Sequence, residues 1–157
     1  MLRRPHYRSL KELSASKQGV ALVELALIAP FLILLITGIV DLALYGATLL
    51  KAQQAVNRGL EMSMMGGTSV DMDAIKIQVE AQAGSPATAT PIPTQECAGV
   101  AATWGSSCAT GQETAKYTQI QLSTTYHPLL AFGTTAWMQT NANGDIPISV
   151  TGVIRIQ

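Results

Sequence analysis

An apolar run extends from Val20 to Leu50 and contains no lysine or arginine. Two carboxylates interrupt this run, Glu24 near its start and Asp41 further along. An apolar stretch of at least about 18 residues is long enough to cross a bilayer as a helix, and 20 helical residues rise about 30 Å, the thickness of the hydrocarbon layer. The pattern therefore predicts a transmembrane helix over residues 20–42.

Beyond the apolar run, less polar residues recur at helical spacing among charged and amide side chains. We expect the helix to continue over residues 51–65 as an amphipathic segment that packs against a folded head, and to end at Gly66-Gly67. A second, short helix is expected over Asp71–Ala83, with Asp71 or Ser69 as its N-cap. Its predicted apolar stripe consists of Ala74, Ile75, Val79 and Ala83.

The C-terminal half of the chain predicts strands. Residues 84–115 are rich in Pro, Thr, Ala, Ser and Gly, so we expect a long loop there. Alternating side chains then predict strands over residues 117–126 and, most clearly, 146–156, with a further run near 134–140. The predicted fold class is α+β: a long N-terminal transmembrane helix continues into an amphipathic helix, which is packed by a small antiparallel sheet.

The charges are distributed unevenly along the chain. Five of the ten basic side chains lie within residues 1–19, together with one acidic side chain. Positively charged flanks of a membrane helix stay in the cytoplasm, so residues 43–157 are expected to form an exported head. Without residues 1–19 the chain keeps five basic and nine acidic side chains. This acidic balance argues against binding to nucleic acid, which needs a basic surface.

The two cysteines, Cys97 and Cys108, both lie in the segment expected outside the cytoplasm. In an oxidising compartment a disulfide is the expected state, worth about 3 kcal/mol in the chain-entropy model, and two free thiols are the alternative. The only histidines are His6 and His127. A metal site needs about four convergent ligands, so we expect neither a metal nor a cofactor. The chain also lacks the G-x-S-x-G and H-E-x-x-H motifs, and we do not expect an enzyme.

Three residues of the predicted anchor depart from its apolar pattern. A carboxylate at the membrane centre costs about 2.5–3.5 kcal/mol and usually marks a function, and we interpret Glu24 as functional on this ground. Pro30 removes one backbone donor and can bend the helix. Asp41 falls at the outer head-group layer, where a carboxylate costs little, so we interpret it as an interfacial residue with no special role.

The run from Gly19 through Glu24 to Pro30, continuing into Gly38-Ile39-Val40-Asp41 and then Ala55…Arg58-Gly59, is similar to the TadE-like pseudopilins. These proteins belong to the tight-adherence (Flp-type) pilus systems of bacteria, within the type IV pilin class. The resemblance covers roughly residues 17–60. It implies a pilin-like head and cleavage between Gly19 and Val20 by an inner-membrane prepilin peptidase, so that residues 1–19 are a cytoplasmic leader.

The resemblance also implies a minor pilin or assembly factor that acts in adhesion and biofilm formation. Its expected partners are the prepilin peptidase, other pilin subunits and the inner-membrane assembly platform. Its expected location is the bacterial inner membrane, with the N-terminus cytoplasmic and the head periplasmic, or the extracellular pilus. Cleavage would create an α-amine at Val20, and this amine can pair with Glu24 of a neighbouring subunit, because opposite charges attract strongly in a low-dielectric fibre core.

Other interpretations of the same sequence stay open. The apolar run is also compatible with a signal peptide cleaved after it, although it is longer than the usual apolar core of 7–15 residues. A second alternative is a single-pass membrane-anchored envelope protein with another role. A third alternative is a tip adhesin that binds through the 84–115 loop around Trp104, a side chain that can instead pack on the disulfide.

Overall fold

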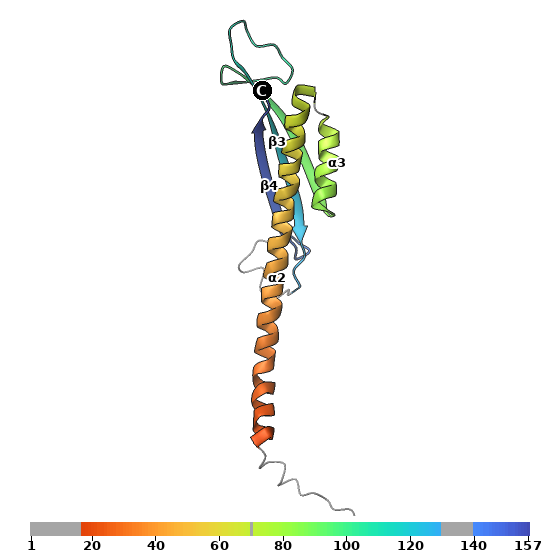
Figure 1. The fold of residues 1–157 in the computed structure, drawn as a ribbon, viewed down its shortest axis with the longest axis vertical. Helices are drawn as coiled ribbons and strands as arrows, with labels where there is room; N and C mark the ends of the chain where they lie inside the picture. The colour runs from red at the N-terminus through yellow and green to blue at the C-terminus, as the bar shows by residue number, and fades with distance from the viewer. Residues whose placement is uncertain (1–16, 70, 130–139) are drawn as a thin grey trace, which may run out of the picture. The chain divides into compact units, whose positions relative to one another are not determined.

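The structure is a computed structural model that describes residues 17–69, 71–129 and 140–157. In chain order the elements are helix α2 (Lys17–Gly66), the 3-10 turn η1 (Gly67–Ser69), helix α3 (Met72–Ala83) and strands β1 (Ala87–Cys97), β2 (Val100–Ala102), β3 (Thr114–Tyr126) and β4 (Ile146–Arg155) (Figure 1). The chain divides into two units, and the boundary falls within α2, between Val40 and Asp41. The α+β fold class is confirmed.

In the first unit the described residues form the N-terminal part of α2. This helix begins at Lys17 rather than at the expected Val20, and it continues through Pro30. Its large apolar side chains are exposed, as they are in a helix surrounded by lipid. α2 is the one helix in the described part of the chain that is long and apolar enough to cross a membrane. Its length and composition indicate membrane anchoring, while residues 1–16 of the predicted leader lie outside the described residues.

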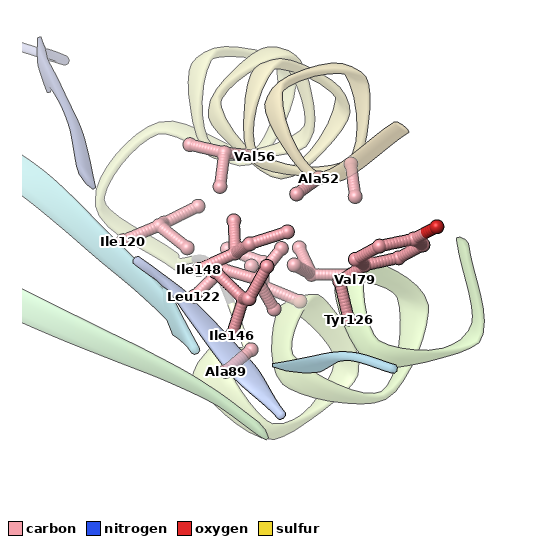
Figure 2. Close-up of a cluster of buried hydrophobic side chains, with 11 residues drawn as sticks. Ala52, Val56, Val79, Ala89, Ile120, Leu122, Tyr126, Ile146 and Ile148 are labelled. Atoms are coloured by element: carbon pink, nitrogen blue, oxygen red, sulfur yellow. The ribbon is translucent and has the colours of Figure 1, made fainter. Parts of the chain in front are cut away.

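The second unit has its hydrophobic core between two helices and one face of the sheet (Figure 2). α2 contributes Ala52 and Val56, which confirms that the helix becomes amphipathic beyond the apolar run. α3 contributes Ile75 and Val79, as its predicted stripe requires. The strands contribute Ala89, Ile120, Leu122, Tyr126, Ile146 and Ile148.

The limits of α3 follow from local capping. Of the two predicted caps, Asp71 is the N-cap, because its Oδ1 accepts a hydrogen bond of 2.9 Å from the Asp73 N–H. One residue of the predicted stripe is wrong, since Ala74 is exposed and Met72 packs against the core instead. The helix ends at Gly84, whose φ of +83° suits a residue without a side chain.

The four strands form one antiparallel sheet in the order β2-β1-β3-β4. The central strand β3 sets the register, since Leu122 pairs with Ala89 of β1 and with Val150 of β4. Side chains on β4 alternate between the core and solvent, as its period of two predicts, so Ser149 and Thr151 are exposed. The two strands predicted over 117–126 and 146–156 are confirmed, whereas the run near 134–140 lies outside the described residues except for Thr140.

The long loop expected over residues 84–115 is wrong for much of its length, because β1 and β2 lie there. Proline removes a backbone donor and so argues against a strand, but not where that donor would face an open edge. In β1 the Ala89 N–H points away from β3 and donates to Glu80 Oε1 at 2.9 Å. In an antiparallel strand every second N–H group faces the same edge. An N–H group at position 91 or 93 would therefore face away from β3, as that of Ala89 does, so Pro91 and Pro93 cost no hydrogen bond to β3.

Two glycines allow the helices and the sheet to approach closely. A Cβ atom on Gly59 of α2 would lie 2.5 Å from Val79 Cγ2 and 2.7 Å from Ile120 Cδ1. A Cβ atom on Gly152 of β4 would lie 2.7 Å from Val56 Cγ1. These distances are shorter than a carbon–carbon contact, whose optimum is about 3.5–4.0 Å. The packing of α2 on the rest of the second unit therefore depends on the absence of a side chain at both positions.

Candidate functional site

The predicted cleavage bond and the membrane carboxylate lie close together on α2. The Gly19–Val20 bond falls near the start of the helix, and Glu24 follows one turn later. Val20 is 57% exposed and Glu24 is also exposed. Residues four apart lie on the same face of a helix, so a second helix lying alongside this face can contact both Val20 and Glu24. The proposed ion pair between subunits stays a prediction.

Pro30 and the residues that follow it leave α2 continuous. Pro30 lies inside the helix, where its missing N–H would otherwise donate to the carbonyl of Ala26. One turn further on, Thr37 Oγ1 donates to the carbonyl oxygen of Ile33 at 2.8 Å, so its hydroxyl is satisfied within the helix. A hydroxyl bonded in this way can lie in an apolar environment at little cost.

Asp41 has a more specific place than the sequence indicated. Its carboxylate accepts a hydrogen bond from the Tyr126 hydroxyl, and its Oδ1 accepts a second one, of 3.0 Å, from the Leu129 N–H. The ring of Tyr126 also packs edge-on against the ring of Tyr45, with 5.8 Å between centroids. Asp41 thus ties α2 to the C-terminal end of β3, and its interpretation as a residue with no special role is wrong.

The contact with Asp41 changes the acidity of Tyr126. Burial of the phenol, the hydrogen bond to Asp41 and the negative charge of that carboxylate together raise the pKa of Tyr126 to about 12, and burial is the largest of the three causes. The ordinary value is 10.0. A pKa that is higher in the folded state means that the neutral phenol stabilises the fold below pH 10, and that this stabilisation is lost as the pH rises from 10 toward 12.

We expect Tyr126→Phe to lower the free energy of unfolding by about 1.5–3 kcal/mol at pH 8, because the substitution removes a hydrogen bond to a charged group. The variant should also lose less stability than the unmodified chain above pH 10, since it lacks the phenol. Urea-induced unfolding in mild detergent at several pH values measures both effects. Tyr45→Phe is the matched control, because it keeps Tyr126 and the ring contact; an equal alkaline loss in all three proteins would contradict this role.

The two cysteines lie at disulfide distance near the end of the sheet, with their Cα atoms 5.5 Å apart. Between them, the chain is held by Gln95, a buried side chain of β1. The Gln95 amide donates to the carbonyl of Ser106 at 2.7 Å and accepts from the Gly105 N–H at 3.0 Å. Trp104, also in this segment, lies with its ring centroid 5.5 Å from the Lys116 ammonium. The part of the expected loop between β2 and β3 is therefore attached to the sheet at several points.

His127 follows the last residue of β3 and has a side chain that is 81% exposed. Its Nδ1 lies 2.6 Å from Asp145 Oδ1, and this hydrogen bond, followed by one from Asn141, holds the pKa of the Asp145 carboxyl below its ordinary value. His127 thus joins the end of β3 to the turn before β4, in keeping with a residue at a strand end. Among the residues that the structure describes, no group of three or more His, Cys, Asp or Glu side chains is placed to hold a metal ion.

A shallow pocket between β1, β3 and β4 is lined by charged side chains, but these are engaged with one another. Arg155 Nη2 lies 2.7 Å from Glu113 Oε1, and Glu96 and Tyr117 are among the other residues that line the pocket. Both partners of this ion pair are at least half exposed, so the pair contributes little to stability. The arrangement does not bring together a nucleophile and a base.

Comparison with known proteins finds a family similarity for the N-terminal part of the chain. The family model described as "TadE-like protein" matches residues 19–60. This range includes Glu24, Pro30, Asp41 and Gly59, and it ends within the part of α2 that packs in the core. No curated protein and no solved structure matches the chain. The match therefore covers the apolar helix and its continuation and does not include α3 or the strands.

Proposed function

Since residues 19–60 of this chain are TadE-like, we propose that it is a minor pilin needed to assemble a tight-adherence pilus. The observation that carries the proposal is a single apolar helix with an exposed carboxylate, Glu24, one turn from a predicted cleavage bond. The TadE-like match supports a structural protein of the pilus system rather than a catalyst. In this role the chain acts in adhesion and biofilm formation through the fibre that it helps to build.

The proposed maturation begins in the inner membrane. The basic leader stays in the cytoplasm, where a prepilin peptidase cuts the bond between Gly19 and Val20 and releases five basic side chains together with the leader. The helix then carries an α-amine at Val20 in place of a peptide N–H. The head stays on the periplasmic side, attached to a helix with apolar side chains exposed on its surface.

The proposed assembly step uses the new amine. In a stack of such helices the Val20 amine of one subunit meets the Glu24 carboxylate of the next. The two charges then move together from the edge of the membrane into the low-dielectric core of the fibre. An unpaired charge in this environment costs several kcal/mol, so only the register that pairs them is favourable. Partners in this step are other pilin subunits and the assembly platform. Exposed side chains along α2 provide the surface on which the neighbouring helices pack.

The mature N-terminus decides between this proposal and an ordinary single-pass envelope protein. Mass spectrometry of the protein purified from cells is expected to find a chain that starts at Val20. A Gly19→Ile variant should keep the leader, because the processing pattern includes the glycine, whereas Gly38→Ile in the same helix has open space at its Cβ and should be processed normally. An intact Met1, or a start beyond residue 40, would end the proposal.

A further inference from the structure

A cluster of side chains surrounds the residue at which the apolar anchor becomes the head. We call Asp41, Tyr45, Tyr126 and Leu129 the collar. Its members are linked by the two hydrogen bonds to the Asp41 carboxylate and by the edge-on contact of the two tyrosine rings. The collar therefore holds the end of β3, which is far along the chain, beside residues 41–45 of α2.

The position of Asp41 along the helix fixes the depth of the collar in a membrane. A helical span of 20 residues from Val20 rises about 30 Å and crosses the hydrocarbon layer. Asp41 follows directly, at the outer head-group layer. Because the Leu129 nitrogen lies 3.0 Å from the Asp41 carboxylate, Leu129 is at this same depth. This step depends on the membrane anchoring that the proposed function includes.

The exposed chemistry around the collar suits the boundary between lipid and water. Leu129 is 64% exposed, and the neighbouring Leu42 on α2 is 65% exposed. Of the two tyrosines only Tyr45 is partly exposed, and tyrosine is enriched at membrane interfaces, where its ring lies among apolar groups. The Asp41 carboxylate is half-buried and accepts hydrogen bonds from two donors of the head, which offset part of the cost of placing its charge near lipid.

We propose that the collar seats the head directly on the outer leaflet, with Leu129 inserted at the boundary between head groups and acyl chains. The occupant of this surface is bilayer lipid, because Leu42 continues the exposed apolar side chains of the anchor along α2, and Leu129 is held at the same depth by its hydrogen bond to Asp41. The head then has two membrane contacts, the anchor and Leu129. A second membrane contact restrains rotation of the head about the anchor, which a single helical attachment does not.

A fluorophore attached at single cysteines tests this seat in the full chain. NBD is attached to Leu129→Cys, to Val100→Cys as an equally exposed position on β2, and to Leu32→Cys within the anchor. The chain without added cysteine is the labelling blank, because Cys97 and Cys108 are paired. Each protein is reconstituted in phosphatidylcholine vesicles that contain lipid with a doxyl quencher, placed near the head group to probe Leu129 and Val100 and near the end of the acyl chain to probe Leu32. We expect quenching at Leu129 to exceed that at Val100 several-fold, with emission shifted to shorter wavelength.

The outcomes separate this inference from the proposed function. Strong quenching at Leu32 with none at Leu129 would overturn the seat and leave the anchor intact. An absence of quenching at Leu32 would overturn the anchoring, and the seat with it. Asp41→Ala removes the link between α2 and Leu129, so it is expected to reduce quenching at Leu129 without changing that at Leu32. Unchanged quenching at Leu129 in this variant would contradict the role of Asp41 in setting the depth.

Discussion

Replacing Glu24 with glutamine is expected to leave the protein in the membrane but to prevent pilus formation. Glutamine keeps the size and polarity of the side chain and removes its charge, so the Val20 amine of a neighbouring subunit would lose its counter-ion. Loss of one partner of a buried ion pair costs about 3–5 kcal/mol, which is roughly a hundredfold or more in the association constant of that contact. Insertion should not suffer, because a carboxylate is costly in a membrane.

The measurement is the amount of pilus sheared from cells that carry each variant, with the protein in the membrane fraction measured in parallel. Leu25→Ala is the matched control, because it changes an exposed neighbour of Glu24 without altering charge, and normal piliation is expected. Normal piliation in the Glu24→Gln variant as well would remove the ion pair from the proposed mechanism. Loss of the protein from the membrane in that variant would contradict the expected insertion.

Gly59→Leu is expected to destabilise the head by about 3 kcal/mol or more. Even a Cβ atom at this position would lie within 2.7 Å of side-chain carbons from α3 and β3, and leucine adds three further carbons. Val79 and Ile120 are both fully buried, so neither side chain can move into solvent. Relief of the overlap requires α2 to move away from α3 and the sheet, which opens the core.

Urea-induced unfolding in mild detergent, followed by circular dichroism, measures this effect. Gly46→Leu is the matched control in the same helix, because no atom lies within 4 Å of a Cβ at that position. Leucine has a higher helix propensity than glycine, so this control should be neutral or up to about 1 kcal/mol more stable. Equal stability of the two variants would show that the close packing at Gly59 is not needed.

The elements that the sequence predicted correctly are those with a distinct hydrophobic pattern of their own. The apolar run from Val20 and the alternation along residues 146–156 each have one dominant pattern, and both appear as α2 and β4. The strand β1 was missed because its prolines and threonines resemble a linker. Its stability comes from pairing with β3, a contact between residues distant along the chain, and from Glu80, which binds the Ala89 N–H.

The role of Asp41 was missed for a related reason. Its position in the sequence indicates only its depth in a membrane, and an acid at that depth needs no partner. The partners come from the other end of the chain, since Tyr126 and Leu129 reach Asp41 only when β3 has paired in the sheet. One signal was present: Tyr45 follows four residues later and lies on the same helix face, where an aromatic ring packs against Tyr126.

Gly59 lies in the run that resembles the TadE-like pseudopilins, but the sequence does not show why a glycine is needed at this position. A glycine in a helix lowers stability by about 1 kcal/mol relative to alanine, which alone counts against the position. The structure shows the compensation, because Val79 and Ile120 occupy the space of the missing side chain. By contrast, Glu24 and the Gly19–Val20 bond gain no new contact from the described structure, so their roles depend on the proposed processing and assembly.

The prolines of β1 have a consequence for a membrane crowded with copies of this chain. An open strand edge is a template on which another polypeptide can add a strand, and it is a common origin of aggregation. Along Ala89–Pro93 an incoming strand would find no available amide donor, because two are absent and Glu80 occupies the third. Neighbouring copies of the chain therefore find little to pair with by β-augmentation along this part of the edge.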